Sequence, residues 1–347
     1  MEFVIVGGGL SGSLLALALR GRDIVLLESG QSLGGNHLWS FHEGDLQGEA
    51  RALVEPLIVA RWPAYEVAFP GHQRRVESGY FSVSSDRLHQ VVTAALGDRV
   101  RFSARAVRLW NGAVELEDGH VLRGRVLDCR GPGQLQGKFA WQKFCGVEVR
   151  TSRAPTLPML MDARVPQVDG FRFLYTLPLA ADRVLVEDTR FSGDPHLDIK
   201  AVHASALTAA RAAGHDGEVL RSEHGVLPLP IDRMPDGQGL GYGGGYFHPV
   251  TGYSLPLAAK VAVSVARGEP LPHWRGAQRF GLLLNRLLYR ATQPEDRFRV
   301  LSRFYQLPEP VLRRFYALES THLDRARILC GRPPRGVSLL RALGALT

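Results

Sequence analysis

Cysteine is scarce in this sequence, and the cysteines present follow no recognisable pattern. The 347 residues contain three, Cys129, Cys145 and Cys330, with no CxxC pair. Their spacings do not predict a disulfide framework. A fold that depends on disulfides is therefore excluded, and a reducing location on the cytoplasmic side is expected. We also expect no metal site.

Long apolar runs are absent as well. The best candidate for a membrane span, residues 253–266, is interrupted by Pro256 and Lys260, so no transmembrane helix is expected. The apolar start carries a glycine-rich motif instead of a basic region, which argues against a signal peptide. The composition, 45% hydrophobic and 22% charged, is that of a globular protein, and the length allows a large core in two closely associated domains.

Acidic residues are few in the last quarter of the chain. From Arg267 onward there are fifteen arginines against six acids, a balance of +9, while the preceding residues hold 27 basic and 28 acidic side chains. This asymmetry indicates either an anionic partner, such as a membrane surface, or simply an arginine-rich solvated surface. Aromatic residues are not interleaved with the arginines and no nucleic-acid motif is present, so nucleic acid is not expected as a partner.

The chain opens with a strand, a glycine turn and a helix. Residues 3–12 read FVIVGGGLSG, and residues 23–28 read DIVLLE. In this motif one glycine makes the tight turn, one admits a pyrophosphate and one lets the helix pack on the strand. The helix N-terminus and the acid after the second strand then bind phosphate and ribose. The predicted dinucleotide contacts are Gly7, Gly8, Gly9, Leu10, Ser11, Gly12 and Glu28.

Three later glycine-rich segments favour FAD over NAD. The loop after Glu28 contains GGN, a strand runs into a second glycine turn at residues 125–133, and a third glycine loop opens a helix near residue 254. A helix N-terminus in that last position would stabilise negative charge on a reduced flavin. An ordinary loop remains the alternative for each segment taken singly. The predicted cofactor contacts here are Gly35, Asn36, Asp128, His248, Gly252, Tyr253 and Ser254.

Two adjacent acids end an apolar run in RVLVEDTRFS, residues 183–192. The run predicts a strand, so Glu187 and Asp188 should point to opposite faces of its sheet. At least one acid would then face a dry side, unless the strand end simply exposes two solvated carboxylates.

Several of these motifs together resemble the bacterial lycopene β-cyclases, which are FAD-dependent carotenoid cyclases. The resemblance runs nearly end to end and depends most on GGNHLWSFH (34–42), LVEDT (185–189) and FHPVTGYSLPLA (247–258), with DRARILCGRPP (324–334) near the end. It implies that the ends of lycopene are folded into β-ionone rings, giving β-carotene through γ-carotene. Such cyclisation is redox-neutral yet needs reduced FAD, with NAD(P)H as the electron source. Plant members have two glutamates where this chain has Glu187 and Asp188.

Under that resemblance, Glu187 and Asp188 are the candidate catalytic residues. An alkene is a poor base, and a carboxyl in an apolar pocket stays protonated to higher pH. Glu187 is therefore predicted to be the acid, or to relay a proton to the flavin, while Asp188 hydrogen-bonds backbone or positions a loop. His248 could relay a proton or fix its loop, and Asp128 could form an Asx turn or contact the cofactor.

The expected fold is α/β. A discontinuous FAD-binding Rossmann-type domain, of the flavin hydroxylase kind, would span residues 1–270. A mixed substrate sheet would be inserted at about 140–225, and a basic helical segment would follow at 271–347. In this segment residues 280–291 show apolar residues at helical spacing. They predict either a core-facing helix or an interfacial helix that docks a peripheral enzyme on anionic membrane.

Aromatic residues could line a polyene tunnel, although core packing is an alternative for each. The candidates are Trp39, Phe41, Trp62, Tyr65, Phe171, Phe173 and Tyr175. Two other functions fit the same fold. One is a flavin monooxygenase or polyprenyl reductase that performs net redox chemistry, and the other is a peripheral membrane protein that holds flavin only structurally.

Overall fold

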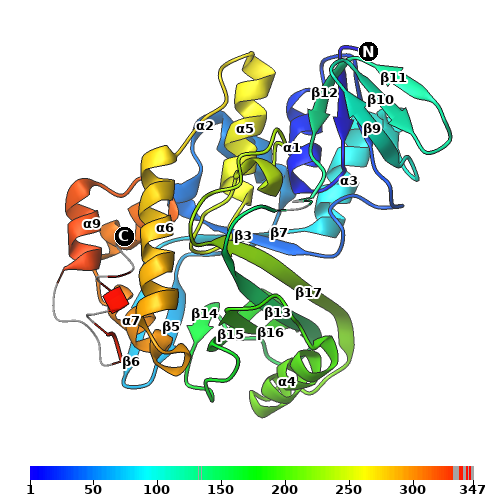
Figure 1. Ribbon diagram of the computed structural model, residues 1–347. Helices are drawn as coiled ribbons and strands as arrows, with labels where there is room; N and C mark the ends of the chain where they lie inside the picture. The colour runs from blue at the N-terminus through cyan, green and yellow to red at the C-terminus, as the bar shows by residue number, and fades with distance from the viewer. Residues whose placement is uncertain (132, 134, 331–335, 339–340, 343, 345–347) are drawn as a thin grey trace.

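The computed structural model describes residues 1–131, 133, 135–330, 336–338, 341–342 and 344. Residue 132 of the second glycine turn and residues 331–334 of the last shared motif lie outside this part. The described strands form four sheets, and a group of helices follows them in the chain. The predicted α/β architecture with a helical C-terminal segment is confirmed (Figure 1).

A parallel sheet at the start of the chain has the order β12-β1-β2-β8. Its strands are β1 (Phe3–Val6), β2 (Ile24–Leu27), β8 (Val100–Arg101) and β12 (Arg125–Asp128). β1 and β2 are continuous apolar runs and are buried throughout, as expected for parallel strands covered on both faces. The strand before the second glycine turn thus closes the sheet beside β1, as the sequence predicted.

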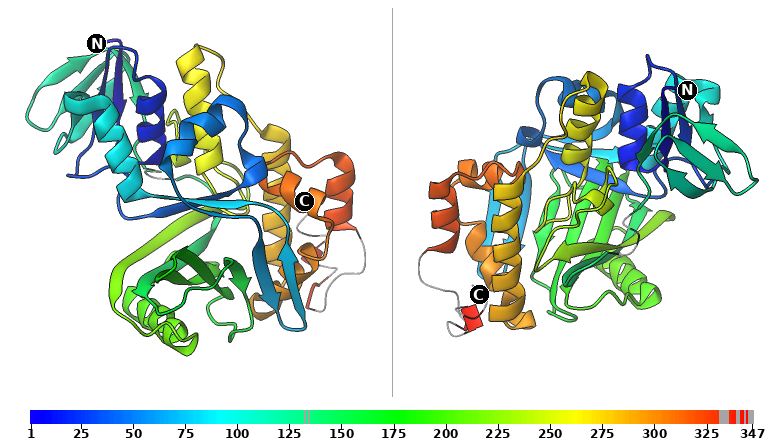
Figure 2. Two further views of the ribbon diagram at one scale, coloured as in Figure 1. Left: turned by 180° about the vertical axis from the view of Figure 1, so that it is seen from behind. Right: turned by 45° about the horizontal axis from the view of Figure 1, so that its top comes forward.

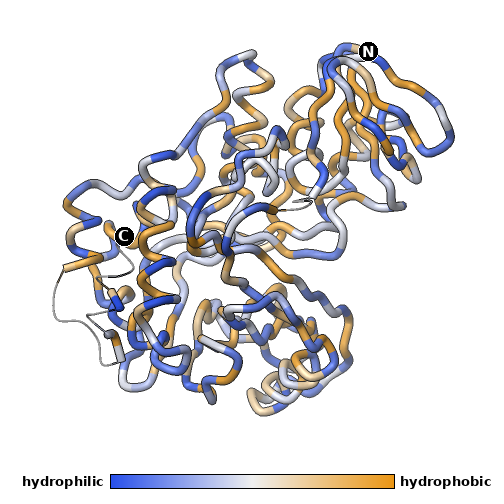
Figure 3. Tube along the Cα trace, viewed as in Figure 1, coloured by the Kyte–Doolittle hydropathy of each residue, from blue (hydrophilic) through white to orange (hydrophobic). Residues whose placement is uncertain are grey.

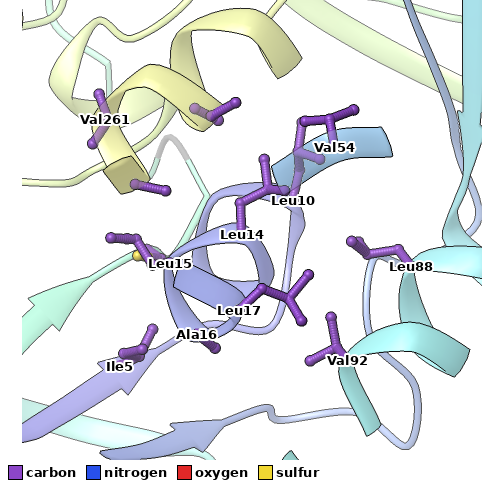
Figure 4. Packing of buried hydrophobic residues seen from close by; sticks show 14 of the residues in the cluster. Ile5, Leu10, Leu14, Leu15, Ala16, Leu17, Val54, Leu88, Val92 and Val261 are labelled. Carbon is purple, nitrogen blue, oxygen red and sulfur yellow. The ribbon is translucent and has the colours of Figure 1, made fainter. Parts of the chain in front are cut away.

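Helix α1 (Leu10–Ala18) lies at the centre of the core on one face of this sheet (Figure 4). Its leucines contact Ile5 below, Val261 of α5 and Val92 of α3. The other face carries the antiparallel sheet β11-β10-β9, which buries Val114 and Leu116 against β1 and β2. The bounds of these elements are α3 (Ser85–Leu96), α5 (Leu255–Arg267), β9 (Ala106–Trp110), β10 (Ala113–Leu116) and β11 (Val121–Arg123).

The largest sheet is mixed and has the order β17-β13-β16-β15-β14-β5-β6, in which only the β14–β5 pair is parallel. Its strands are β5 (Tyr65–Phe69), β6 (His72–Val76), β13 (Phe139–Arg150), β14 (Met159–Asp162), β15 (Phe171–Ala180), β16 (Arg183–Ser192) and β17 (Val219–Pro230). Two of its strands therefore come from residues 65–76, well before the expected insertion at 140–225.

Helix α4 (Ile199–Ala212) covers one face of the large sheet and packs on the valines of β13 and β16. On the opposite side the small sheet β3-β7-β4 connects the large sheet to the parallel sheet (Figure 1). Its strands are β3 (Leu38–His42), β4 (Ile58–Trp62) and β7 (Tyr80–Ser84). Short helical elements fill the connections: α2 (Gly48–Val54), η1 (Glu43–Asp45), η2 (Glu55–Leu57), η3 (Gly97–Arg99), η4 (Tyr242–Gly244) and η5 (Pro294–Asp296).

The C-terminal helices stand beside the β14–β6 end of the large sheet, as both views in Figure 2 show. They are α6 (Arg275–Ala291), α7 (Arg297–Phe304), α8 (Glu309–Tyr316) and α9 (His322–Leu329). None of the helices in the described residues is long and apolar enough to span a bilayer.

Hydrophobic and hydrophilic residues alternate along α6 (Figure 3), and its apolar stripe faces inward. Phe280, Leu288 and Ala291 are buried, and the side-chain amide of Asn285 donates to the carbonyls of Pro230 and Pro249. Gly281 allows this close approach, because a Cβ there would stand 2.3 Å from Pro249 Cγ. The apolar stripe of α6 is therefore core-facing, and only its arginine-bearing side remains available to a membrane surface.

Candidate functional site

A cavity of about 560 Å³ lies between the large sheet, β3, the loop before α5 and the C-terminal helices. Most of its lining is apolar and includes Phe173 and Phe191 on the sheet, Leu287 on α6 and Phe304 on α7. Segments separated by more than 250 residues meet here. The arrangement suits a long apolar ligand, because such sites are concave, mostly apolar and carry few polar groups.

One row of residues crosses four strands of the large sheet at the wall of this cavity. Glu223 on β17 pairs with Gly146 on β13, Gly146 pairs with Glu187 on β16, and Glu187 pairs with Tyr175 on β15. Directly paired residues in antiparallel strands project to the same face. The two glutamates and the tyrosine therefore share a face, and all three line the cavity.

Glu187 is a buried acid in mainly apolar surroundings. The hydroxyl of Thr189 donates a hydrogen bond to its Oε1. Burial raises the pKa of Glu187, and the nearby carboxylate of Glu223 raises it further, because both disfavour the charged form. Both effects favour the protonated form of this carboxyl group at the cavity wall.

Asp188 points to the opposite face, as the strand alternation predicted. Its carboxylate is fully buried and pairs with Arg172 at 2.9 Å and with Arg190 at 3.4 Å, and it accepts a 2.5 Å hydrogen bond from Ser205 of α4. These partners replace the backbone or loop contacts expected from the sequence. We therefore propose for Asp188 a role in joining α4 to the sheet, and no direct part in the chemistry.

Glu223 was not singled out by the sequence, where it stands in the polar segment RSEHG. It is 4% exposed, and its Oε2 accepts from the backbone N–H of Leu38 at 3.1 Å and lies 3.3 Å from Arg221 Nη2. Burial raises the pKa of Glu223, while the guanidinium of Arg221 opposes that effect. Alternation along β17 determines only which face of the strand carries Glu223. Its closeness to Glu187 follows from the register in which β17 and β16 pair with β13.

A chain of hydroxyl groups continues from Tyr175. Its hydroxyl donates to Ser40 at 3.0 Å and lies 2.9 Å from that of Tyr80, which in turn lies 2.7 Å from that of Tyr253. These bonds connect the large sheet, β3, β7 and the loop before α5. Among the aromatics considered from sequence, Trp39, Phe173 and Tyr175 line the cavity, whereas the buried core holds Phe41, Trp62, Tyr65 and Phe171.

The first glycine turn has the geometry that a pyrophosphate needs. Gly7 has a φ of +104°, and a Cβ on Gly12 would stand 1.9 Å from the carbonyl of Gly7. Gly9, by contrast, has nothing within 4 Å of its Cβ position. It caps α1, whose first turn, Leu10 to Gly12, has no side-chain cap. The open N–H groups at this helix N-terminus fit a bound phosphate.

Glu28 closes the same turn. Its two carboxylate oxygens accept from the backbone N–H groups of Gly8 at 2.8 Å and Gly30 at 2.6 Å. Farther along, Gly35 adopts a left-handed φ of +66°. Next to it, Asn36 bonds Ser222 and Arg221 of β17 at 2.7 Å each. The loop expected to wrap a flavin is thus connected to the strand that carries Glu223.

Asp128 forms the Asx turn considered from the sequence, because its Oδ1 accepts from the backbone N–H of Arg130 at 3.1 Å. The Arg130 guanidinium also pairs with this carboxylate at 2.9 Å. The carbonyl of Asp128 accepts from Leu240 at 2.7 Å. This bond joins the second glycine turn to the third glycine-rich segment.

The loop before α5 forms part of the cavity wall. Gly252, Tyr253 and Ser254 line it, and no side chain caps the helix that starts at Leu255. His248 lies behind them, where Nδ1 accepts from the N–H groups of Val250 and Thr251 and Nε2 lies 3.1 Å from the carbonyl of Phe315. Burial lowers the pKa of His248 to about 4. Both ring nitrogens are thus engaged with backbone groups, as expected for the loop-fixing alternative.

These features fit FAD. The open backbone at Gly9, the acid at Glu28 and the uncapped N-terminus of α5 at the cavity would suit the pyrophosphate, the ribose and the ring of a flavin dinucleotide. Within the described residues no group of three or more His, Cys, Asp or Glu side chains is arranged to hold a metal ion.

Sequence comparison identifies relatives over nearly the whole chain. The family model "Lycopene cyclase protein" matches residues 2–342. A lycopene beta-cyclase of Pseudescherichia vulneris is 39% identical, with 96% of this chain and 94% of that protein covered. One of Paracoccus sp. is 38% identical at the same coverage, and one of Pantoea ananas is 36% identical, with 99% and 97% covered.

Solved structures with the same fold share far less sequence. A probable FAD-dependent monooxygenase of Pseudomonas aeruginosa superposes with a TM-score of 0.57 at 16% identity, covering 94% of this chain and 99% of that one. A geranylgeranyl bacteriochlorophyll reductase-like protein of Thermoplasma acidophilum has a TM-score of 0.56 at 13% identity, with 99% and 95% covered. These likenesses show a flavoprotein fold, and the sequence matches show that the chain belongs to the lycopene cyclase family.

Proposed function

We propose that the protein is a lycopene β-cyclase that closes the linear ends of lycopene into β-ionone rings, giving β-carotene by way of γ-carotene. The observation that carries the proposal is the buried carboxyl group of Glu187, whose pKa is raised by burial, at the wall of a largely apolar cavity. Family membership supports the same substrate class.

The chemistry needs a strong acid in a dry site. Glu187 would donate its proton to the terminal double bond, which leaves a tertiary cation; the ring carbon–carbon bond then forms, and a neighbouring ring carbon loses a proton. One proton enters and one leaves, so no electrons are consumed. Gly7 to Gly12 and Glu28 would hold FAD, and reduced FAD would supply negative charge beside the cation. NAD(P)H is the proposed electron source.

We also propose that the enzyme takes its polyene from an anionic membrane surface, as a peripheral protein on the cytoplasmic side. The cavity reaches Arg327 to Leu329 on α9, a helix whose Leu323 is 61% exposed. Arg275, Arg279 and Arg290 on α6 are exposed as well. Exposed leucines beside arginines suit the boundary between lipid headgroups and acyl chains.

The direct test is purified protein with lycopene and chemically reduced FAD, with products separated by chromatography. We expect monocyclic and then bicyclic product, formed with reduced but not with oxidised FAD, and no reductant consumed per ring. If one nicotinamide were oxidised for each product molecule, a monooxygenase or polyprenyl reductase would replace the cyclase. If turnover were indifferent to flavin reduction, the flavin would be structural.

A further inference from the structure

The cavity wall carries a second carboxyl group. We propose that Glu223 is a positioning carboxylate for Glu187: its negative charge beside Glu187 makes the pair hold a single proton, and that proton resides on Glu187. Only the effect of this pair on catalysis rests on the proposed function. The sharing of one proton is a property of the pair itself.

The first argument is the missing side chain between the two acids. β16 and β17 flank β13, and Glu187 and Glu223 both pair with Gly146. A Cβ on Gly146 would stand 3.5 Å from Glu187 Cβ and 3.3 Å from Glu223 Cγ. Both side chains thus adjoin the one position in the row that has no side chain, and they face each other across it.

The second argument is the difference between their hydrogen-bond partners. Glu223 accepts from the N–H of Leu38 and lies beside the guanidinium of Arg221, and both favour its charged form. Among the described residues, Glu187 accepts a hydrogen bond from the hydroxyl of Thr189 alone. Since two neighbouring buried carboxylates rarely ionise together, the less well-supported one retains the proton. The geometry therefore assigns the charge to Glu223 and the proton to Glu187.

Other titratable groups around the pair do not reverse this assignment. Tyr175 on β15 and His37 before β3 line the same cavity. Burial raises the pKa of Tyr175 and lowers that of His37, so it favours the uncharged form of both side chains. Glu148 on β13 is paired with Arg221 and Arg183. On the opposite face, Asp188 is paired with Arg172 and Arg190, and the thiol of Cys145 has a pKa raised by burial.

In catalysis, the consequence is that the carboxyl group of Glu187 carries a proton at neutral pH before each turnover. When Glu187 gives its proton to the alkene, its O–H bond breaks, a C–H bond forms, and two carboxylates adjoin the cavity that holds the cation. The proton released from the ring carbon restores the singly protonated pair, while the electrons of its C–H bond become the ring double bond. Atoms and electrons balance without another reactant.

The test is Glu223→Gln, which keeps an oxygen for the N–H of Leu38 but removes the charge. Removing a neighbouring negative charge lowers the pKa of Glu187. In the variant, Glu187 should therefore lose its proton at a pH lower than in the wild type by on the order of one unit. The infrared band of a protonated carboxyl, identified by its absence in Glu187→Gln, reports this titration without any substrate. The alkaline limb of cyclisation should shift in the same direction.

Glu148→Gln is the matched control, because Glu148 is also buried and paired with Arg221 but does not flank Gly146. It should leave the carboxyl titration near that of the wild type. An unchanged titration in Glu223→Gln, or an equal shift in Glu148→Gln, would overturn the inference. If Glu223→Gln showed the expected shift but the wild-type protein formed no cyclic product, the proposed function would be refuted. The inference that the two carboxyl groups share one proton would remain valid.

Discussion

Glu187 and Asp188 are neighbours in sequence, yet the structure gives them different surroundings. The β16 strand directs Glu187 into the cavity and Asp188 toward α4. The first has a pKa raised by burial, whereas the second is held by two arginines. Substitution of Glu187 should therefore affect mainly turnover, and substitution of Asp188 should affect mainly stability.

Glu187→Gln should abolish proton donation while preserving the fold. Glutamine keeps the size and the acceptor for Thr189 but has no transferable proton. A general acid typically contributes about a hundred- to ten-thousandfold in rate, so turnover should fall at least that far. FAD content and lycopene binding, measured by absorbance and by quenching of protein fluorescence, should stay near wild type. Near-normal turnover would mean that the proton comes from another group.

Asp188→Asn should instead lower stability. Removing one partner of a buried ion pair takes away the counter-charge of Arg172 and leaves Arg190 with Asp169 at 3.6 Å, at a cost of about 3–5 kcal/mol. Thermal or urea unfolding should show the loss, and turnover per folded, FAD-loaded molecule should change much less than in Glu187→Gln. A variant with normal stability and no turnover would place Asp188 in the chemistry after all.

Sequence reasoning at this scale reached Glu187 but missed Glu223. Alternation within one strand follows from its apolar run, and it assigned the faces of Glu187 and Asp188 correctly. The proximity of Glu223 depends on the register between β13 and β17, which contains an irregularity between Glu148 and Val149. The number of residues between two strands does not determine such a register.

At the scale of elements, the strand, glycine turn and helix at residues 3–18 could be predicted well, because Gly7, Gly8 and Gly12 each stand where a side chain would meet other atoms. Contacts between distant segments could not. β5 and β6 join the large sheet through the parallel pairing of β5 with β14 across some ninety residues, and nothing in either segment specifies that partner. The direction of the α6 stripe was equally open, because amphipathicity alone does not identify what covers it.

Gly9→Ala tests whether the glycine turn before α1 binds the pyrophosphate of FAD. Its Cβ would project into open space next to the N-terminus of α1, where the pyrophosphate would lie, and it meets no protein atom within 4 Å. The fold should therefore survive, as judged by circular dichroism, while FAD affinity is lost. Gly21→Ala, also with nothing within 4 Å but beyond the end of α1, should retain FAD. Wild-type FAD affinity in Gly9→Ala would contradict this mode of binding.

At the scale of the whole molecule, charge and cavity coincide. The excess of arginine is concentrated after residue 267, and the helices there form one side of the cavity. The parallel sheet lies at the other end of the molecule, with the β9–β11 sheet beyond it (Figure 1). A polyene entering through the helical end would thus approach Glu187 while FAD is held from the opposite side.

Membrane docking through the helical end should depend on salt and on lipid charge. Each arginine near an anionic surface contributes about 1 kcal/mol, so replacing Arg275, Arg279 and Arg290 together with glutamine should weaken binding roughly a hundredfold. Flotation with anionic and neutral liposomes at rising ionic strength measures this. Leu323→Ser, which removes an apolar contact but no charge, should weaken binding to both lipids.

The matched control replaces Arg105, Arg108 and Arg123 with glutamine, since these exposed arginines lie in or beside the β9–β11 sheet, at the far end of the molecule. It changes net charge by the same amount and should bind anionic liposomes like the wild type. Equal losses in the two triple variants would mean that net charge alone attracts the protein to lipid. Equal binding of the wild type to anionic and neutral vesicles would exclude an electrostatic approach, and the polyene would then have to be delivered by another route.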